Sequence, residues 1–140
     1  MKFWDSSAII PLIVNEPSSM RIIKLLTVDR FIAAWWGTTI ECRSAVARLR
    51  RQGIFSSADE TSAINLLKLL SEGWTEILPG DVLRETAYRL LIAHPLRAAD
   101  AMQLSAAMIW AGKNSGKNDF VCLDERLREA AYKEGFKVLP

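Results

Sequence analysis

Short apolar runs alternate with longer amphipathic segments along the whole chain. The apolar runs predict strands at residues 2–5, 31–35, 74–78, 120–123 and 136–139. The segment Phe31–Trp35 is apolar throughout, as expected of a strand whose two faces are both covered. The segments between the runs repeat apolar residues at helical spacing. They predict helices at residues 6–14, 18–28, 39–52, 56–72, 81–93, 97–111 and 124–134, with a polar loop at residues 113–118.

Strands separated by helices indicate a parallel sheet, because each crossover between parallel strands is right-handed and lays a helix over one face of the sheet. We therefore expect an α/β fold with helices on both faces. At 140 residues, the chain is most simply one domain (residues 1–140) and is long enough to bury a core. The additional helices within residues 39–72 make this a helix-rich variant.

Polar residues and a proline mark the start of several predicted helices. Ser6 and Ser7 are expected to cap the first helix, and Pro11 fits within about its first turn. Ser57 is followed three residues later by Glu60, which is the spacing of a capping box at the start of the fourth helix. On the second helix, the apolar residues are expected to face the core; they are Ile22, Ile23, Leu25 and Leu26.

The composition is that of a soluble globular protein, with 50% hydrophobic and 24% charged residues. The net charge of +2 is too small to indicate a polyanionic partner by itself, so any nucleic-acid binding must come from local clusters of charge. No apolar run is long enough to cross a membrane, and the first residues do not have the pattern of a signal peptide. Cys42 and Cys122 lack the spacing of a metal site. We expect both to be buried reduced thiols, and the protein to be cytoplasmic.

Four acidic residues lie where a strand passes into a helix or where a helix begins: Asp5, Glu41, Asp100 and Asp124. In a parallel α/β sheet, such junctions meet at the carboxyl edge, where ligands bind. Two charges ~4 Å apart repel by roughly 4 kcal/mol at an effective dielectric constant of about 20. Several ionised carboxylates can therefore share this edge only with a cation such as Mg²⁺ or Mn²⁺, or with some of them protonated.

Each of these acids also has a purely structural interpretation. Asp5 and Asp124 can act as helix N-caps, and Asp100 suits the positive end of a helix dipole. Thr38 and Glu41 together have the spacing of a capping box. The convergence of all four at one edge favours a metal site. Asp119 is excluded because it precedes its strand and belongs to the opposite edge.

Four segments carry a resemblance to a known family: Phe3–Ala8, Thr38–Glu41, Leu96–Leu104 and Phe120–Leu127. Their order and spacing resemble those of PIN domains, and in particular the small VapC-like toxins of prokaryotic toxin–antitoxin pairs. The resemblance covers essentially the whole chain. It implies a three-layer PIN-like α/β/α fold with a mostly parallel five-stranded sheet in the order 3-2-1-4-5. It also implies an endoribonuclease that depends on Mg²⁺, with Mn²⁺ as a substitute.

The same resemblance places Asp5, Glu41, Asp100 and Asp124 in the metal site, with a hydroxyl of Ser7 or Ser6 close to Asp5. Many relatives carry Thr or Ser two residues before the fourth acid, where this chain has Cys122. The resemblance further suggests a homodimer and a small antitoxin protein that covers the pocket. The candidate docking surface comprises the apolar side chains of residues 9–14, 22–26 and 66–70.

The chemistry follows from the ligand types, since an oxygen-only site selects a hard cation that polarises a phosphodiester and activates a water. We assign Asp5 and Asp100 to the first metal, with Glu41 and Asp124 orienting the water or completing a second site. Thr38 is expected to contact the substrate or support the acids, and Arg97 to contact a phosphate. We expect Trp35 to lie in the core and Trp36 to be able to stack on a base. His94 is expected to be a loop residue. The remaining candidate basic residues are expected to be mostly solvated; they are Arg43, Arg48, Arg50, Arg51, Lys113 and Lys117.

Three other classes of protein also place acids at strand ends. A phosphoryl-accepting receiver domain would need an acidic pair after the first strand, and a haloacid-dehalogenase-type phosphatase would need an aspartate at position 7. Ser6 and Ser7 stand at those positions instead. A non-catalytic PIN-like scaffold that binds RNA or a protein partner stays open as the alternative function.

Overall fold

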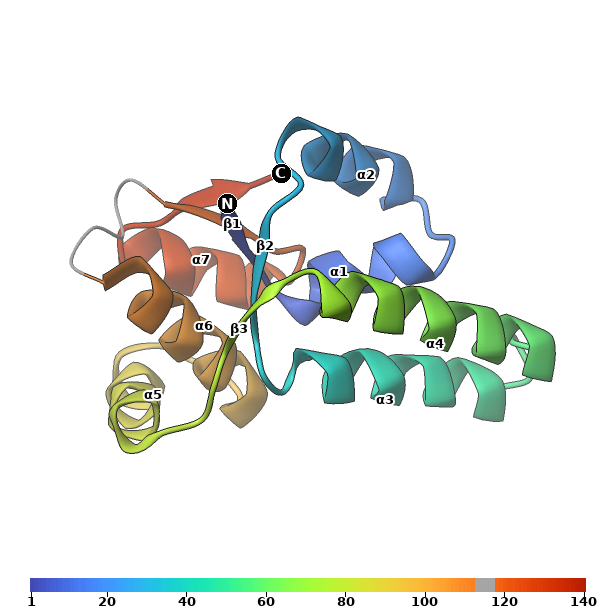
Figure 1. Ribbon diagram of the computed structural model, residues 1–140. Coiled ribbons are helices and arrows are strands. Elements are labelled where there is room, and N and C mark those ends of the chain that lie inside the picture. The colour runs from blue at the N-terminus through green and yellow to red at the C-terminus, as the bar shows by residue number, and fades with distance from the viewer. Residues whose placement is uncertain (113–117) are drawn as a thin grey trace.

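The computed structural model describes residues 1–112 and 118–140, and the polar loop expected at residues 113–118 lies almost wholly outside them (Figure 1). The strands are β1 (Lys2–Trp4), β2 (Ile32–Trp35), β3 (Thr75–Ile77), β4 (Asp119–Val121) and β5 (Lys137–Leu139). The helices are α1 (Ser6–Ile13), α2 (Ser19–Val28), α3 (Thr38–Arg51), α4 (Ser57–Glu72), α5 (Asp81–Ala93), α6 (Ala98–Ala111) and α7 (Glu125–Lys133).

The strands form a single sheet in the order β3-β2-β1-β4-β5, and every neighbouring pair is parallel. The central strand β1 pairs with β2 through Phe3 and Ala33 and with β4 through Phe3 and Phe120. This confirms the expected α/β fold and strand order. The sequence predicted a mostly parallel sheet, and the sheet described here is wholly parallel.

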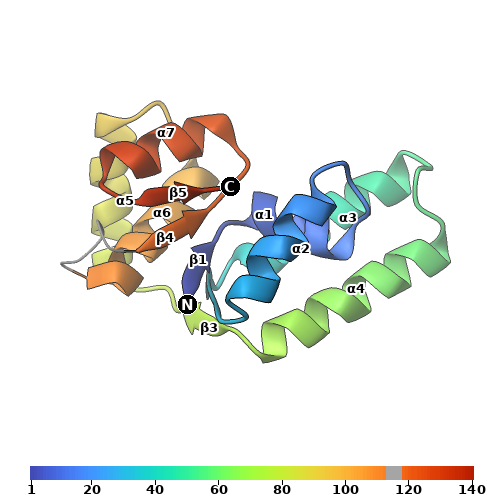
Figure 2. The ribbon, with the colours of Figure 1, turned by 90° about the horizontal axis from the view of Figure 1, so that it is seen from above.

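Alternate side chains of the strands enter two separate cores. Phe3 and Phe120 stack with their ring centroids 5.5 Å apart in a core shared with α5, α6 and α7. Trp4 and Val121 lie in the other core, which α1 to α4 cover. Figure 2 shows these two groups of helices on opposite sides of the strands. All four of these side chains are fully buried. Because both faces of the central strands are covered, their sequences are continuous apolar runs.

The connections place a switch point between β1 and β4. The chain leaves β1 and reaches β2 and then β3 by way of α1 to α4, all on one side of the sheet. It then reaches β4 and β5 by way of α5, α6 and α7 on the other side. Ligands of open α/β sheets bind at the carboxyl edge beside such a reversal. Residues that follow β1 and β4 are therefore in the position to form a site.

Three details of the helix starts differ from the sequence-based expectation. Asp5 caps α1, while Ser6 and Ser7 are already helical. Pro11 lies in the second turn of α1, where its ring is buried. At α4 the capping box begins one residue earlier than expected and is made by Ser56 and Asp59. The two changes of capping residue have a local cause: a side chain must precede the first helical residue to reach the free N–H groups of the first turn.

Helix α2 buries less of its surface than its apolar pattern predicted. Ile22 is fully buried, but Ile23 is 43% exposed, and Leu25 and Leu26 are only partly buried. Helix α2 packs against α1 at the periphery of its layer, so only a narrow stripe of it meets the core. The prediction that all four face inward is therefore wrong for Ile23. In residues 1–112 and 118–140, no helix combines the length and the apolar character needed to cross a membrane.

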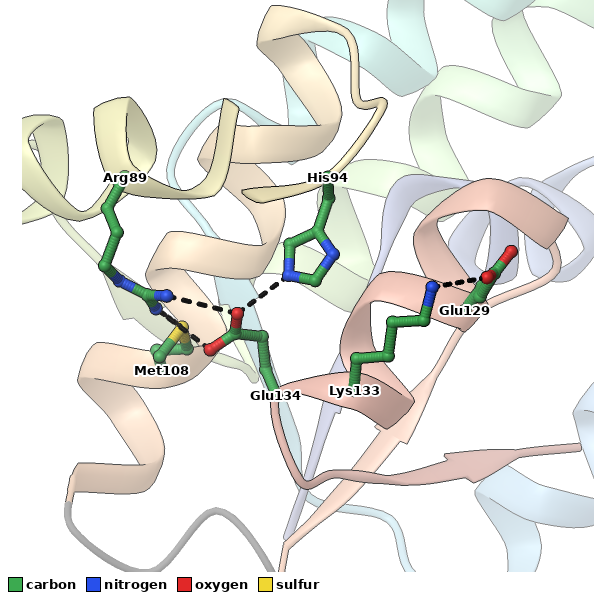
Figure 3. A network of polar contacts seen from close by, with 6 residues as sticks. All are labelled: Arg89, His94, Met108, Glu129, Lys133 and Glu134. Atoms are coloured by element: carbon green, nitrogen blue, oxygen red, sulfur yellow. Dashed lines mark hydrogen bonds and ion pairs between the residues drawn. The ribbon is translucent and has the colours of Figure 1, made fainter. Parts of the chain in front are cut away.

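A polar network holds the end of α5 against the end of α7 (Figure 3). Glu134 accepts bonds from Arg89 at 2.9 and 3.2 Å, and its Oε1 lies 2.7 Å from Nε2 of His94. His94 follows the last residue of α5 and its side chain is 8% exposed. It thus has a structural partner, in agreement with its interpretation as a loop residue.

Candidate metal centre

Asp5 follows the last residue of β1 and is almost completely buried, with 3% exposure. Its Oδ2 accepts hydrogen bonds from the backbone N–H of Ser7, at 2.9 Å, and from the Ser7 hydroxyl. Asp5 is therefore the N-cap of α1, as its structural interpretation allowed. Burial raises the pKa of Asp5, and the bonds from Ser7 oppose that rise. A buried carboxyl with only neutral donors is a suitable ligand for a cation.

Ser7 connects α1 to the end of β4. Its hydroxyl donates to Asp5 and accepts a 2.9 Å bond from the backbone N–H of Leu123. The Sγ of Cys122 lies 3.6 Å from both Oδ2 of Asp5 and Oγ of Ser7. Burial raises the pKa of Cys122, so its thiol stays protonated and serves as a weak donor. Cys42 is also buried and unpaired in the described part of the chain, and both cysteines are free thiols as expected.

Glu41 lies in the first turn of α3, and each of its carboxylate oxygens has one donor. The hydroxyl of Ser6 donates to Oε2 at 2.8 Å, and Nε2 of Gln103 donates to Oε1 at 2.9 Å. Burial raises the pKa of Glu41 to about 6, and the negative charges of Asp5 and Asp100 add to that rise. Glu41 is thus within electrostatic range of two of the other three acids.

The capping-box interpretation of Thr38 and Glu41 is wrong. Gly37 occupies the N-cap position of α3, so Thr38 is already helical. Thr38 is fully buried, and its Oγ1 accepts a 3.1 Å bond from Nε2 of Gln103. Both side chains instead contact α6 across the fold, because Nε2 of Gln103 donates to Oγ1 of Thr38 and to Oε1 of Glu41. Thr38 is therefore enclosed by the fold and is connected to Glu41 through Gln103.

Asp100 and Asp124 line a second part of the site. Oδ2 of Asp100 accepts a 3.2 Å bond from the backbone N–H of Arg97, and Oδ1 of Asp124 accepts a 2.9 Å bond from Leu127 at the start of α7. A cavity of about 270 Å³ is lined by Arg97, Asp100, Asp124 and Arg126. Burial raises the pKa of Asp100, the charge of Asp124 adds to the rise, and the two arginines oppose it.

The four acids form one electrostatic cluster in two parts. The inner part joins Asp5 and Glu41 through the start of α1, and the outer part joins Asp100 and Asp124 around the cavity. The charge of Asp100 acts on Glu41, which links the parts. Asp5, Asp100 and Asp124 also accept bonds from N–H groups at helix starts, as their structural interpretation allowed.

The carboxylates do not form a closed cage in this arrangement of side chains. Among the described residues, no three His, Cys, Asp or Glu side chains make a compact metal-ligand group. The fit to a hard cation rests on the donor set, which is oxygen-only and includes the buried carboxyl of Asp5. The helix-start N–H groups use one oxygen of each outer carboxylate, Oδ2 of Asp100 and Oδ1 of Asp124.

The prediction from the sequence did not include two residues that lie near the acids. Gln103 is fully buried and contacts Glu41, and Arg126 lines the cavity with Asp100. Gln103 could have been found as the one amide on an otherwise apolar helix, three residues after Asp100 and therefore on the same face. Arg126 carries no such signal, since an arginine in the first turn of a surface helix is ordinary.

The aromatic and basic residues lie mostly as expected. Trp35 is buried and Trp36 is 45% exposed, with their ring centroids 6.2 Å apart. Arg97 is exposed at the rim of the cavity. The four arginines of α3 are exposed, namely Arg43, Arg48, Arg50 and Arg51. Lys113 and Lys117 lie outside the described residues. Asp119 begins β4 and lies 4.0 Å from Lys2, so it belongs to the opposite edge, as predicted.

Comparison with known proteins identifies the fold. No protein-family model matches the chain, and no curated protein matches it in sequence. Among solved structures, FitAcB from Neisseria gonorrhoeae is 14% identical in sequence and superposes with a TM-score of 0.69. The match covers 100% of this chain and 97% of the FitAcB chain. The chain has the PIN-like α/β/α fold.

Two further structures agree with this assignment of the PIN-like fold. PAE2754 from Pyrobaculum aerophilum is 20% identical with a TM-score of 0.65, covering 98% of this chain and 87% of its own. A structure of FitAB bound to an IR36 DNA fragment is 15% identical with a TM-score of 0.68, covering 99% of this chain and 94% of its own. At such identities the likeness concerns the path of the chain alone.

Proposed function

We propose that the protein is a Mg²⁺-dependent endoribonuclease, with Mn²⁺ as a substitute, and the toxin of a toxin–antitoxin pair. The single observation that supports this most is the electrostatic cluster of Asp5, Glu41, Asp100 and Asp124 beside the switch point of a PIN-like sheet. Parallel α/β sheets bind ligands at this edge, and an oxygen-only donor set suits a hard cation.

Asp5 and Asp100 would hold the first cation, with Glu41 and Asp124 orienting water or completing a second site. When bound, the cation supplies charge stabilisation to the phosphodiester and makes water a better nucleophile. Ser7 holds the Asp5 carboxylate through its hydroxyl. The chain's own contribution to catalysis is thus to hold carboxylate oxygens in place at a partly buried edge.

Recognition of RNA would use the groups around the acids. Arg97 and Arg126 line the same cavity as Asp100 and Asp124, so their guanidinium groups can pair with phosphates that the acids alone would repel. Trp36 is exposed on the segment between β2 and α3, and its ring can stack on a base. The basic residues flank the acidic cluster, which is the arrangement that a polyanionic substrate requires.

We propose a small antitoxin protein as the partner, docked on the apolar surface between α2 and α4. Three large apolar side chains are exposed on this surface: Ile23 at 43%, Leu66 at 46% and Leu69 at 67%. Neighbouring exposed apolar side chains of this kind are typical of a protein-binding surface. Two cavities of about 400 and 300 Å³ lie here and share Ile23 in their linings. A homodimer and a cytoplasmic location complete the proposal, on the strength of the family resemblance.

The test is cleavage of a panel of tRNA and mRNA substrates by the purified protein in Mg²⁺, in Mn²⁺ and in excess EDTA. Asp5→Asn should abolish cleavage and preserve the fold, because asparagine is as good an N-cap as aspartate and removes only the charge. Asp119→Asn is the matched control, since Asp119 lies at the opposite edge of the sheet. Full activity of Asp5→Asn would contradict the assignment of Asp5.

The alternative is a non-catalytic PIN-like scaffold that binds RNA or a protein. It predicts no cleavage of any RNA in Mn²⁺ and no binding of Mn²⁺ by calorimetry. Cleavage that survives excess EDTA would contradict the metal-dependent mechanism and leave the fold assignment unchanged.

A further inference from the structure

Gln103 is a polar residue in an otherwise apolar environment. It lies on α6, where its neighbours Ala101, Leu104 and Ala106 belong to the core, and it is itself fully buried. It follows Asp100 by three residues, so the two side chains share one face of the helix. Helix α6 therefore presents a carboxylate and an amide to the acidic cluster together.

The amide of Gln103 completes a two-sided support of Glu41. Its Nε2 donates to Oε1 of Glu41 at 2.9 Å and to Oγ1 of Thr38 at 3.1 Å. From the other side, Ser6 on α1 donates to Oε2 of Glu41 at 2.8 Å. The carboxylate is thus held between α1 and α6, which are separated by most of the chain. A side chain held at both oxygens keeps one orientation and has little freedom to rotate.

Packing of the core alone does not explain this arrangement. Oε1 of Gln103 is buried and has no hydrogen-bond partner within residues 1–112 and 118–140. Leaving a buried polar atom without a partner is unfavourable for folding, and the amide is needed only because Glu41 and Thr38 require its N–H groups as donors. A buried amide that is only half satisfied, beside a candidate site, indicates that the site and not the core requires it.

We infer that Gln103 is a positioning residue that holds Glu41 in the orientation that a divalent cation or its water requires. The inference rests on the proposed nuclease function and goes beyond it. Because Gln103 and Asp100 are on one rigid helix, any displacement of α6 moves Asp100 and the support of Glu41 together. Groups that orient metal ligands in this way typically change metal affinity or activity by about 10- to 100-fold when they are removed.

The test compares Gln103→Met with Ser105→Ala. Methionine keeps the volume of glutamine and removes the donor. Ser105 is the matched control because it is also fully buried on α6, but its hydroxyl bonds to the backbone of Leu83 on α5. We expect Gln103→Met to weaken Mn²⁺ binding in calorimetry by about 10-fold or more, and to lower kcat for RNA cleavage similarly. Ser105→Ala should leave both quantities at the wild-type level.

A double-mutant cycle separates positioning from a general structural effect. If Gln103 acts through Glu41, then adding Gln103→Met to Glu41→Gln should cause no further loss of Mn²⁺ affinity. Additive losses would overturn the inference, as would wild-type Mn²⁺ affinity and kcat in a folded Gln103→Met protein.

A measurement on the wild-type protein applies even if Gln103→Met does not fold. The side-chain amide resonances of Gln103 should shift on titration with Mg²⁺, because the carboxylate that they contact then interacts with the cation or with its water. Unchanged resonances at saturating Mg²⁺ would overturn the inference alone. A wild-type protein that neither binds Mn²⁺ nor cleaves RNA would instead overturn the proposed function on which the inference rests.

Discussion

The hydroxyl of Ser7 accepts a 2.9 Å hydrogen bond from the backbone N–H of Leu123 while it donates to the carboxylate of Asp5. These residues follow β1 and β4, the two strands between which the direction of the connections reverses. A single hydroxyl therefore links the segments that follow β1 and β4 and contacts Asp5, the most buried of the four acids. The edge is stabilised by the same contacts that prepare the candidate site.

Removing that hydroxyl should affect both stability and activity. Ser7→Ala leaves the N–H of Leu123 without its acceptor, so we expect a loss of about 1–3 kcal/mol in the free energy of unfolding by urea. Ser71→Ala is the control, because the hydroxyl of the half-buried Ser71 bonds only to the backbone of Lys68 in its own helix, and its loss should change stability by less than about 0.5 kcal/mol. Equal stability of the two variants would contradict the role of Ser7.

Divalent cations should raise the melting temperature of the protein. Ligands that bind only the folded state stabilise it, by about 2.7 kcal/mol at a concentration 100 times the Kd. Asp100→Asn should remove most of this effect, since it withdraws one of the two carboxylates assigned to the first cation. Thermal unfolding with Mg²⁺, Mn²⁺ and EDTA checks this. A Mg²⁺-induced rise of the same size in Asp100→Asn would contradict the assignment.

The free energy of unfolding of the metal-free protein should depend on pH because of Glu41. Its pKa is raised from 4.5 to about 6 in the folded state, so between these values the folded protein binds more protons than the unfolded one. Stability relative to Glu41→Gln should therefore fall as the pH rises from about 4.5 to about 6. The fall is at most about 2 kcal/mol, reduced by solvent screening. Urea unfolding in EDTA across this window measures it, and a rise would contradict the prediction.

The network of Figure 3 should matter for stability and not for cleavage. Glu134→Gln loses charge-assisted bonds to Arg89 and His94, and we expect a loss of about 1–2 kcal/mol in urea unfolding with kcat unchanged. Glu129→Gln is the matched control, because the exposed pair of Glu129 and Lys133 contributes little.

The pH dependence of this loss has a definite sign. The pKa of Glu134 is lowered, chiefly by Arg89, so its contribution is complete above the usual value near 4.5 and disappears as the pH falls through the lowered pKa. The stability difference between wild type and Glu134→Gln should therefore shrink in acid. A difference that grows below pH 4.5 would contradict this account.

Much of the fold and part of the site could be predicted from the sequence. Burial on both faces leaves a continuous apolar run, and helices between such runs require parallel strands, so the elements and the acids at their ends were recognisable. The strand order 3-2-1-4-5 came from the family resemblance, which the structure confirms. The positions of Asp5 and Asp124 after their strands, and of Asp119 at the start of its strand, required no knowledge of tertiary contacts.

Only the tertiary structure decided which partners the acids have. Glu41 and Gln103 are 62 residues apart, and Ser7 and Leu123 are 116 residues apart, so no local spacing encodes these contacts. The alternative interpretation of Thr38 and Glu41 as a capping box is wrong because Gly37 is the N-cap and Thr38 is already helical. Both side chains instead accept a bond from Gln103 on another helix, which a pattern within α3 cannot predict. The sequence determines which acids follow a strand or begin a helix at the carboxyl edge of the sheet. The neighbours of each acid, its burial and hence its pKa depend on how the helices pack.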